Sequence, residues 1–495
     1  MPKVLITFLF IILFTNSFTQ NTFEYLLSND KDQEIFDVIE DQDGNFAFVG
    51  RIKNSQADYS DGYIFKIGSN GELLDELTIH QDTIGCSFYN IHIYNDAFFV
   101  LGNDLFDTQI SYSAYLWLMQ LNSDLTTLNE WVFNIPNDRW FVYMKSIVDS
   151  DTNIVITGYT MREDTVGFSP YNFDPFFYKI SRDGDSLVSK FMTLPFSLTM
   201  STDILEKSDT SGYYAYCFAI ADLPQAGQRY ELSKNLDSID IVGVPYWIYG
   251  YISSISLYDS IILISGEGGP PQTTPDYSIN VLTLTEDNIP IDYNYFKIEG
   301  NMRDRTAYLY GLGKNEDNIY VGGTSNIDFA NPYYSSLDSW YHLIKVNPDL
   351  TPIWEYWYGG DAYYHLYSIE ATNDAGCIMV GTRYDDAIQY MERDIYILKV
   401  NSDGLLVGTD ENPSIKMREA LIFPNPGNNH IEVRIAAQHL QSKFELYDMS
   451  GKHVLTNKIH GKWGEVNTTA LKTGTYIYLI YNSEGLFEQG KWIKQ

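Results

Sequence analysis

Two short acidic segments have the residue types and spacing of a calcium-binding loop. Residues 41–45 (DQDGN) and 149–153 (DSDTN) each place Asp, Asp and Asn at alternate positions. These oxygen ligands suit Ca²⁺, but no Glu follows where a twelve-residue calcium loop needs its bidentate ligand. Because Asp, Asn and Gly also reverse the chain readily, we expect hairpin turns here, with calcium binding as the alternative.

Three arginines could form a set that binds an anion. Arg51, Arg162 and Arg383 each follow an apolar strand that ends in a small residue, so they could share one face. Sialidases hold a carboxylate with three arginines and use a Tyr nucleophile, and residues 181–186 (SRDGDS) partly match the structural Asp-box of sialidase-type propellers. No spacing rule tests whether the arginines converge. We expect them to form surface ion pairs with this acidic chain instead.

Other catalytic patterns are missing from the sequence. The histidines are scattered, and there is no HExxH zinc motif, no GxSxG nucleophile elbow and no phosphate-binding glycine loop. Acidic pairs at any spacing arise by chance, because residues 1–414 hold 58 Asp and Glu. The sequence therefore assigns no catalytic, cofactor-binding or metal-binding residue, and it favours a protein that is not an enzyme.

The elements that would position a site repeat along the chain. A six-residue frame recurs about every 55 residues. It consists of a residue that is often Lys, an aliphatic, a small or polar residue, any residue, Asp or Asn, and then most often Gly or Leu. It starts at Lys66, Gln120, Lys179, Glu231, Thr283, Lys345 and Lys399. Upstream of each frame, an apolar strand ends in a small residue, at Gly50, Gly102, Gly158, Cys217, Gly266, Gly322 and Gly381. A polar turn and another strand come before that strand, so each unit has four antiparallel strands.

Seven such units fit one architecture. A lone four-stranded sheet cannot bury both faces, whereas seven arranged around an axis can, as a β-propeller. Stacked β-sandwiches would need about 100 residues each. The last unit lacks an outer strand after Gly404, and residues 22–27 resemble the outer strand within residues 353–360. We therefore expect an all-β, seven-bladed β-propeller over residues 20–408, with the N-terminal strand completing blade seven.

The long loops between second and third strands should emerge on one face, here called the long-loop face. They carry tyrosines among Asp, Asn and Pro, namely Tyr59, Tyr171, Tyr333, Tyr334, Tyr384 and Tyr390. Exposed Tyr rings beside such polar groups suit stacking on sugars or gripping a protein. We expect a glycan or protein ligand on this face, with ordinary variable loops as the alternative.

Charge separates the chain into two parts. The net charge is -33. Residues 415–495 carry 10 Lys and Arg against 7 Asp and Glu, so the remainder carries 22 against 58, a net charge of -36. Nucleic acid and anionic membranes would repel such a surface, which favours solubility outside the cell. No stretch after the N-terminus is long and apolar enough to predict a transmembrane helix.

The N-terminus predicts export. In residues 1–19, Lys3 precedes an apolar stretch, and Ser17 and Thr19 stand at −3 and −1 of a cut before Gln20, as in a secretory signal peptide. No Cys adjoins the cut, which argues against a lipoprotein. The three cysteines, Cys86, Cys217 and Cys377, are far apart. We expect buried free thiols, with one disulfide as the alternative.

A second domain begins near Ala420. Short alternating strands predict a compact β-sandwich over residues 420–495, after a linker at 409–419. Four motifs mark this segment: Phe423-Pro424-Asn425-Pro426, Leu446-Tyr447-Asp448-Met-Ser-Gly451-Lys452, Leu471-Lys-Thr-Gly474-Thr-Tyr476 and Lys491-Trp-Ile-Lys494. They closely resemble the type A C-terminal sorting domain of the type IX secretion system of Bacteroidetes. Only Phe423 departs from the family's opening Tyr-Pro-Asn-Pro.

This resemblance implies a route and a partner. The signal peptide would deliver the chain to the periplasm, and the type IX machinery would recognise the sorting domain and move the cargo across the outer membrane. The sorting domain is normally cut off, here near the linker, and the cargo is released or attached to surface lipopolysaccharide. We therefore expect a secreted or surface-attached binding or adhesion protein of a Gram-negative bacterium.

Two alternatives to a binding protein remain. One is a carbohydrate-active hydrolase or lyase built on the propeller, and the other is a structural surface spacer. A cluster of Arg, His or paired carboxylates at the axis of the long-loop face would favour the enzyme.

Overall fold

The computed structural model describes residues 21–494 except for a set of short segments. Those segments are 55–58, 81–84, 106–114, 136–139, 164–170, 193–198, 220–225, 259, 269–276, 299–302, 317, 388–390, 407–419, 424, 426, 436–440, 450, 462 and 484. The expected signal peptide at 1–19 and linker at 409–419 therefore lie outside the described residues.

Residues 21–406, as far as they are described, form seven antiparallel sheets whose strands follow chain order. Blades one to three contain β2 (Lys31–Glu40), β3 (Phe46–Asn54), β4 (Asp61–Ile67) and β5 (Leu73–Ile79); β6 (Gly85–Tyr94), β7 (Ala97–Leu105), β8 (Tyr115–Leu121) and β9 (Thr127–Asn134); and β10 (Trp140–Val148), β11 (Ile154–Glu163), β12 (Tyr171–Ile180) and β13 (Ser186–Phe191). Blades four and five contain β14 (Thr199–Glu206), β15 (Gly212–Ala219), β16 (Ala226–Ser233) and β17 (Ser238–Gly243), then η1 (Pro245–Trp247), and β18 (Tyr249–Tyr258), β19 (Ile261–Gly268), β20 (Ser278–Thr285) and β21 (Pro290–Phe296). Blades six and seven contain β22 (Asp304–Thr306), β23 (Leu312–Lys314), β24 (Ile319–Ser325), β25 (Trp340–Val346) and β26 (Pro352–Gly359), and β27 (Tyr363–Ala371), β28 (Cys377–Tyr384), β29 (Asp394–Val400) and β1 (Phe23–Leu27).

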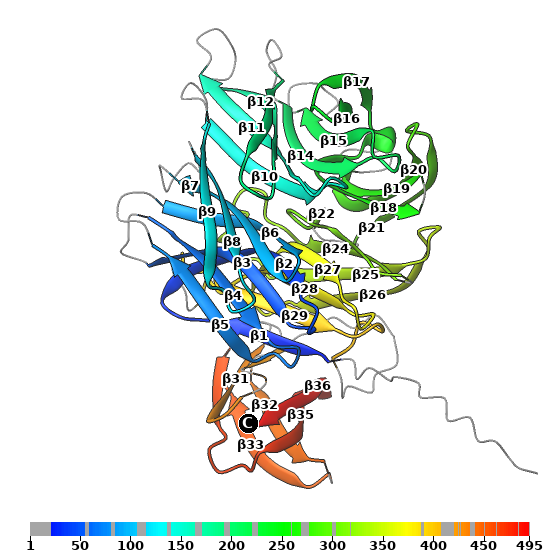
Figure 1. Ribbon diagram of the computed structural model, residues 1–495. Helices are drawn as coiled ribbons and strands as arrows, with labels where there is room; N and C mark the ends of the chain where they lie inside the picture. The colour runs from blue at the N-terminus through cyan, green and yellow to red at the C-terminus, as the bar shows by residue number, and fades with distance from the viewer. Residues whose placement is uncertain are drawn as a thin grey trace, which may run out of the picture.

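The sheets close into a ring. The innermost strands contact one another in the order β2, β6, β10, β14, β18, β23 and β27, and β27 contacts β2 again. The first strand, β1, pairs with β29 and is the outermost strand of blade seven (Figure 1). This confirms the predicted seven-bladed β-propeller and its closure by the N-terminal strand, which joins the two ends of the ring.

The recurring small residues do not end their strands, contrary to expectation. Strand β3 continues beyond Gly50 to Asn54, and β28 continues beyond Gly381 to Tyr384. In both blades the inner strand bulges directly opposite the glycine, between Ile35 and Asp37 in blade one. The bulge brings a carbonyl of the inner strand over the glycine Cα, where any side chain would overlap it. The pattern therefore marks bulges of the inner strands.

Apolar side chains of facing blades form the core. Blades one and two, for example, pack Val49 and Ile64 against Phe88 and Val100. Successive residues of a strand point to opposite faces of its sheet. Because both faces are buried against neighbouring blades, the strands are nearly continuous apolar runs in the sequence. The three cysteines lie in three separate clusters of this kind and are buried free thiols, as expected.

The C-terminal segment is a small β-sandwich, also as expected. One sheet joins β30 (Ala420–Phe423), β31 (His430–Ile435) and β34 (Trp463–Asn467). The other joins β33 (His453–Ile459), β32 (Ser442–Asp448), β35 (Gly474–Asn482) and β36 (Gly485–Lys494). Both contribute to a core around the fully buried Trp492. Across the described part of the chain, no helix has the length and hydropathy to span a membrane.

Candidate functional site

Glu34 lies at the axis of the propeller near the long-loop face. Arg51 Nε and Arg393 Nη1 each lie 2.5 Å from a carboxylate oxygen of Glu34, and the Tyr367 hydroxyl donates to it over 2.7 Å. Burial alone would raise the pKa of Glu34, but Arg393 and Arg51 outweigh burial and lower it to about 2. The ionised Glu34 therefore ties inner strand β2 of blade one to blade seven.

His365 lies beside this carboxylate on β27. Its ring centroid is 4.9 Å from that of Tyr367 and 6.0 Å from those of Tyr308 and Tyr333. No hydrogen bond reaches either ring nitrogen from the described residues. Burial, and then the charge of Arg305, lower the pKa of His365 to about 3, so the imidazole is neutral at pH 7. The neutral ring keeps one N–H but lacks the acidic imidazolium proton that general-acid catalysis by His uses.

Ion pairs neutralise the cluster internally. Arg305 pairs with Glu267, and its guanidinium carbon lies 4.4 Å from the centroid of the Tyr251 ring. Arg393 also binds Asp32, with Nη2 2.7 Å from the carboxylate. The cluster thus contains three arginines and three carboxylates. Glu34 pairs with Arg51, Asp32 with Arg393, and Glu267 with Arg305. The cluster has no net charge with which to attract an anionic ligand.

Tyrosines are the accessible part of this region. Half-buried rings from four blades surround the axis, namely Tyr89, Tyr159, Tyr251 and Tyr308. Tyr333 is 38% exposed, in the loop between β24 and β25, and its ring centroid lies 5.5 Å from the Arg393 guanidinium carbon. Glu34, His365 and Tyr367 are each at most 2% exposed. The arrangement suits stacking and hydrogen bonding to a ligand on the rings, with the charged groups acting as their support.

Of the three candidate arginines, the two whose side chains are described, Arg51 and Arg383, do not converge. Arg51 joins the axial cluster, whereas Arg383 is buried within blade seven, with Nη2 2.8 Å from Asp361. The side chain of Arg162 lies outside the described residues. Arg51 and Arg383 do pair with acidic residues, as expected. The prediction that these pairs lie on the surface was wrong, because Arg51 is partly buried and Arg383 is fully buried. The sequence did not predict Arg305, within β22, or Arg393, directly before β29, as residues of this cluster. No local pattern shows that an Arg at either position lies near the propeller axis.

Only part of the predicted tyrosine set is accessible. Tyr333 is exposed as expected, and Tyr59 and Tyr334 are half-buried. Tyr384 is buried against Tyr334, with ring centroids 5.4 Å apart, because β28 runs further than its glycine suggested. The side chain of Tyr171 and the whole of Tyr390 lie outside the described residues.

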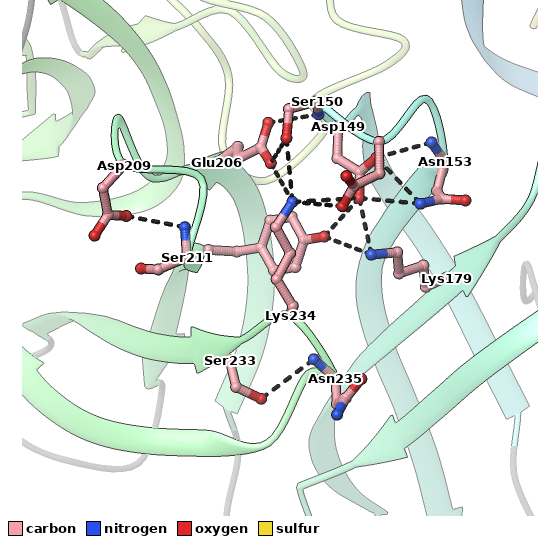
Figure 2. A network of polar contacts seen from close by, with 12 residues as sticks. Asp149, Ser150, Asn153, Lys179, Glu206, Asp209, Ser211, Ser233, Lys234 and Asn235 are labelled. Atoms are coloured by element: carbon pink, nitrogen blue, oxygen red, sulfur yellow. Dashed lines mark hydrogen bonds and ion pairs between the residues drawn. The ribbon is translucent and has the colours of Figure 1, made fainter.

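The acidic segments are hairpin turns whose carboxylates are in use. Figure 2 shows Asp149 beside Asn153, from whose backbone amide it accepts at 2.8 Å. Asp149 also accepts from the Tyr213 hydroxyl at 2.7 Å. Lys179 Nζ, from the start of the recurring frame, lies 2.9 Å from the same carboxylate. Lys66 and Asp41 form the matching pair in blade one at 2.7 Å. The residues described include no cluster of three or more side chains suited to a metal, and calcium binding stays a prediction.

In the C-terminal sandwich, the opening and closing motifs meet. Asn425 donates from Nδ2 to the Lys491 carbonyl at 2.8 Å and accepts from the Ile493 amide at 3.0 Å. Lys494 Nζ donates to Asn428 Oδ1 at 2.7 Å. Pro424 and Pro426 lie outside the described residues. The first and last motifs are thus hydrogen-bonded to each other in the folded sandwich.

The middle motifs shape turns and strand ends. Asp448 Oδ1 accepts from the Lys452 amide at 3.1 Å, across a turn in which Gly451 has a φ of 80°. Tyr447 donates to Glu445 at 2.7 Å. Gly474 begins β35, and the hydroxyl of Tyr476 donates to the Lys472 carbonyl at 2.7 Å. Their role in sorting stays a prediction.

The sandwich packs on blade seven. Phe423 is 5% exposed within an apolar cluster that includes Tyr358 and Tyr396 of the propeller. Asn425 forms a β-bridge with Glu24 of β1, the strand that closes the ring. Arg434 Nη1 lies 3.8 Å from the carboxylate of Asp394. Figure 1 shows the sandwich next to β1.

The chain is thus a seven-bladed β-propeller protein that carries a C-terminal β-sandwich. Residues 421–495 match the family described as the secretion system C-terminal sorting domain. The sandwich is therefore a sorting domain of the type IX secretion system, which implies export by that system.

Among curated proteins, none matches the sequence. Similar solved structures include a fungal alcohol oxidase of the AA5 family, at 13% identity and a TM-score of 0.41, covering 93% of this chain and 96% of that one. Pyrococcus horikoshii acylaminoacyl peptidase follows at 10% identity and 0.43, covering 81% of this chain but only 57% of the peptidase. The β-propeller domain of the Trilobed protease from Pyrococcus furiosus matches at 8% and 0.33, covering 76% and 96%. At these identities, the activities of those proteins do not carry over.

Proposed function

We propose that this chain is a secreted or cell-surface-attached binding or adhesion protein of a Bacteroidetes-type Gram-negative bacterium. Residues 1–19 act as signal peptide, 20–408 as the propeller cargo, 409–419 as linker and 420–495 as the sorting domain. The long-loop face of the propeller contacts a glycan or a protein. The observation that supports a binding role is the group of accessible Tyr rings around the Arg–carboxylate cluster, which has no net charge. The sorting domain supports the export of this propeller.

Glycan-array binding tests the ligand directly. The mature chain, residues 20–495, is applied with and without calcium beside a Tyr333→Ala variant. We expect binding that Tyr333→Ala weakens by about tenfold, because an exposed ring contributes about 1.4 kcal/mol of stacking and burial. An Ile239→Ala variant, which changes an exposed side chain on β17 outside the long loops, is the control. Absence of glycan binding by the mature chain in either condition, together with no protein captured from the cell surface by crosslinking at Tyr333, overturns the binding role.

A reporter fusion tests the export route separately. Residues 409–495 are fused behind a reporter that carries a signal peptide, in a host with the type IX system. Appearance of the reporter outside the outer membrane supports the proposed route. Its retention in the periplasm counts against it.

A carbohydrate-active hydrolase or lyase is the second candidate. The observation in its favour is the axial cluster itself, in which Tyr367 hydrogen-bonds Glu34 beside His365. The burial of these three groups favours a structural role instead. Release of reducing ends or unsaturated products from a polysaccharide panel would support the enzyme. Because Glu34→Gln is expected to destabilise the propeller, loss of activity in this variant counts only if circular dichroism shows that it is folded.

A further inference from the structure

A cavity lies between blades two and three, on the face opposite the long loops. Its volume is about 500 Å³, within the range of about 300–1,000 Å³ found for small-molecule sites. The side chains that matter in its lining are the rings of Tyr94 and Trp131, the amides of Asn95, Gln120 and Asn129, and the guanidinium of Arg182. It therefore combines aromatic surfaces with groups that both donate and accept hydrogen bonds.

The lining of the cavity includes a position at which blade two departs from the repeat. In blades one, three and seven, the Lys that starts the recurring frame binds a carboxylate of the turn between the first two strands. The pairs are Lys66–Asp41 at 2.7 Å, Lys179–Asp149 at 2.9 Å and Lys399–Asp374 at 2.9 Å. The last of these pairs lines another cavity, of about 490 Å³, between blades seven and one. Blade two has Gln120 in place of the Lys.

The turn of blade two is also shorter. Asn95 and Asp96 form it with φ values of 47° and 62°, as in a two-residue hairpin turn. The blades with a Lys–Asp pair use longer turns, closed by bonds such as Asn45 to Asp41. A short turn and an uncharged side chain at Gln120 thus distinguish this cavity from the one that the Lys399–Asp374 pair lines.

The walls of the cavity are held in place. Asn129 donates to Gln120 Oε1 at 2.7 Å, and the Arg182 guanidinium carbon lies 4.1 Å from the centroid of the Tyr94 ring. Gly184 lies against the indole of Trp131, where any side chain would overlap the ring. With a φ of 84°, position 184 also favours glycine. The ring and the amides are thus positioned before any ligand arrives, which lowers the entropic cost of binding.

We propose that this cavity binds an uncharged saccharide. The faces of aromatic rings carry negative charge density and attract the polarised C–H groups of a sugar ring. The three amides offer donors and acceptors to hydroxyl groups, which also do both. Asp183 in the lining balances the charge of Arg182, and residues 1–414 carry a net charge of -36, so anionic sugars and phosphates are disfavoured. This site is separate from the long-loop face and does not depend on the function proposed there.

The substitution Gln120→Lys is the sharpest test. It introduces the residue that blades one, three, six and seven carry at this position, and it replaces one of the three lining amides by a charged amine. Trp131→Ala removes the stacking surface. Val132→Ala, a neighbour on β9 that is 51% exposed, is the matched control. Circular dichroism and thermal unfolding of each variant establish that it is folded.

Binding is measured on the mature chain, residues 20–495, by saturation-transfer NMR with cellobiose, chitobiose, mannobiose, lactose, galacturonic acid and sialic acid. We expect at least one neutral sugar to bind wild type, with Kd about tenfold or more weaker in Gln120→Lys and Trp131→Ala, as loss of a ring contact implies. Val132→Ala and Tyr333→Ala should bind as wild type does.

Three outcomes would overturn the proposal. They are no neutral sugar bound by wild type, a folded Gln120→Lys that binds undiminished, and stronger binding of the acidic sugars. Loss of neutral-sugar binding in Tyr333→Ala alone would place the saccharide on the long-loop face and also refute this site.

Discussion

Replacing Glu34 by Gln should destabilise the propeller at the junction of its first and last blades. The carboxylate is 2% exposed and receives Arg51, Arg393 and Tyr367. Its pKa falls from the usual 4.5 to about 2, and at about 1.4 kcal/mol per pH unit this difference corresponds to about 3 kcal/mol. Glu34→Gln keeps the shape but leaves two buried arginines short of a charge, so we expect a loss of about 3 kcal/mol at pH 7.

The dependence on pH has a definite sign. Because the folded state lowers the pKa of Glu34, it binds fewer protons than the unfolded chain near pH 3–4. The stabilisation is complete above about pH 5 and disappears as the pH falls toward about 2. Wild type should therefore lose about 3 kcal/mol more than Glu34→Gln over this interval, and the two proteins should converge in acid.

Urea unfolding followed by tryptophan fluorescence, repeated from about pH 7 to about pH 3, measures this difference. Glu130→Gln, at an exposed position on β9, is the control for removing one charge. If Glu34→Gln were as stable as Glu130→Gln at pH 7, or if its difference from wild type did not shrink in acid, the reasoning about this buried pair would be refuted.

Three further perturbations test other parts of the structure. Gly381→Ala should cost about 1–3 kcal/mol, because the added Cβ overlaps the His365 carbonyl, whereas Gly243→Ala meets no atom within 4 Å and should be tolerated; equal melting temperatures would argue against the bulge. Burial raises the pKa of the Cys217 thiol to about 12, and all three cysteines are buried, so a thiol reagent at about pH 8 should label none until the chain unfolds; native labelling would contradict their burial. Asn425→Ala loses both bonds to the last strand and should lower export of the reporter fused to residues 409–495, with the sorting domain less stable by about 1–3 kcal/mol; undiminished export would show these bonds to be dispensable.

Local patterns were predictable where each unit carries its own signal. The frame that starts at Lys66 and last recurs at Lys399 spans the end of the third strand of each blade. The number of blades could therefore be counted from the sequence. The weak end of blade seven and the apolar residues near Phe23 revealed the closing strand, which β1 forms. The glycines predicted strand ends but mark bulges, because the reason for each glycine is a carbonyl of the neighbouring strand, which the sequence around the glycine does not show.

The sequence by itself determined the repeat, the all-β architecture and the sorting domain, since alternation, turn residues and motif spacing act over a few residues. Only the tertiary structure decided which distant side chains meet. Glu34 and Arg393 are 359 positions apart, yet ring closure brings them within 2.5 Å, and no local pattern encodes that distance. The same holds for the cavity beside Gln120, which requires a wall from each of two blades. Contacts across blades depend on how the sheets are arranged around the axis, and that arrangement exists only in the folded ring.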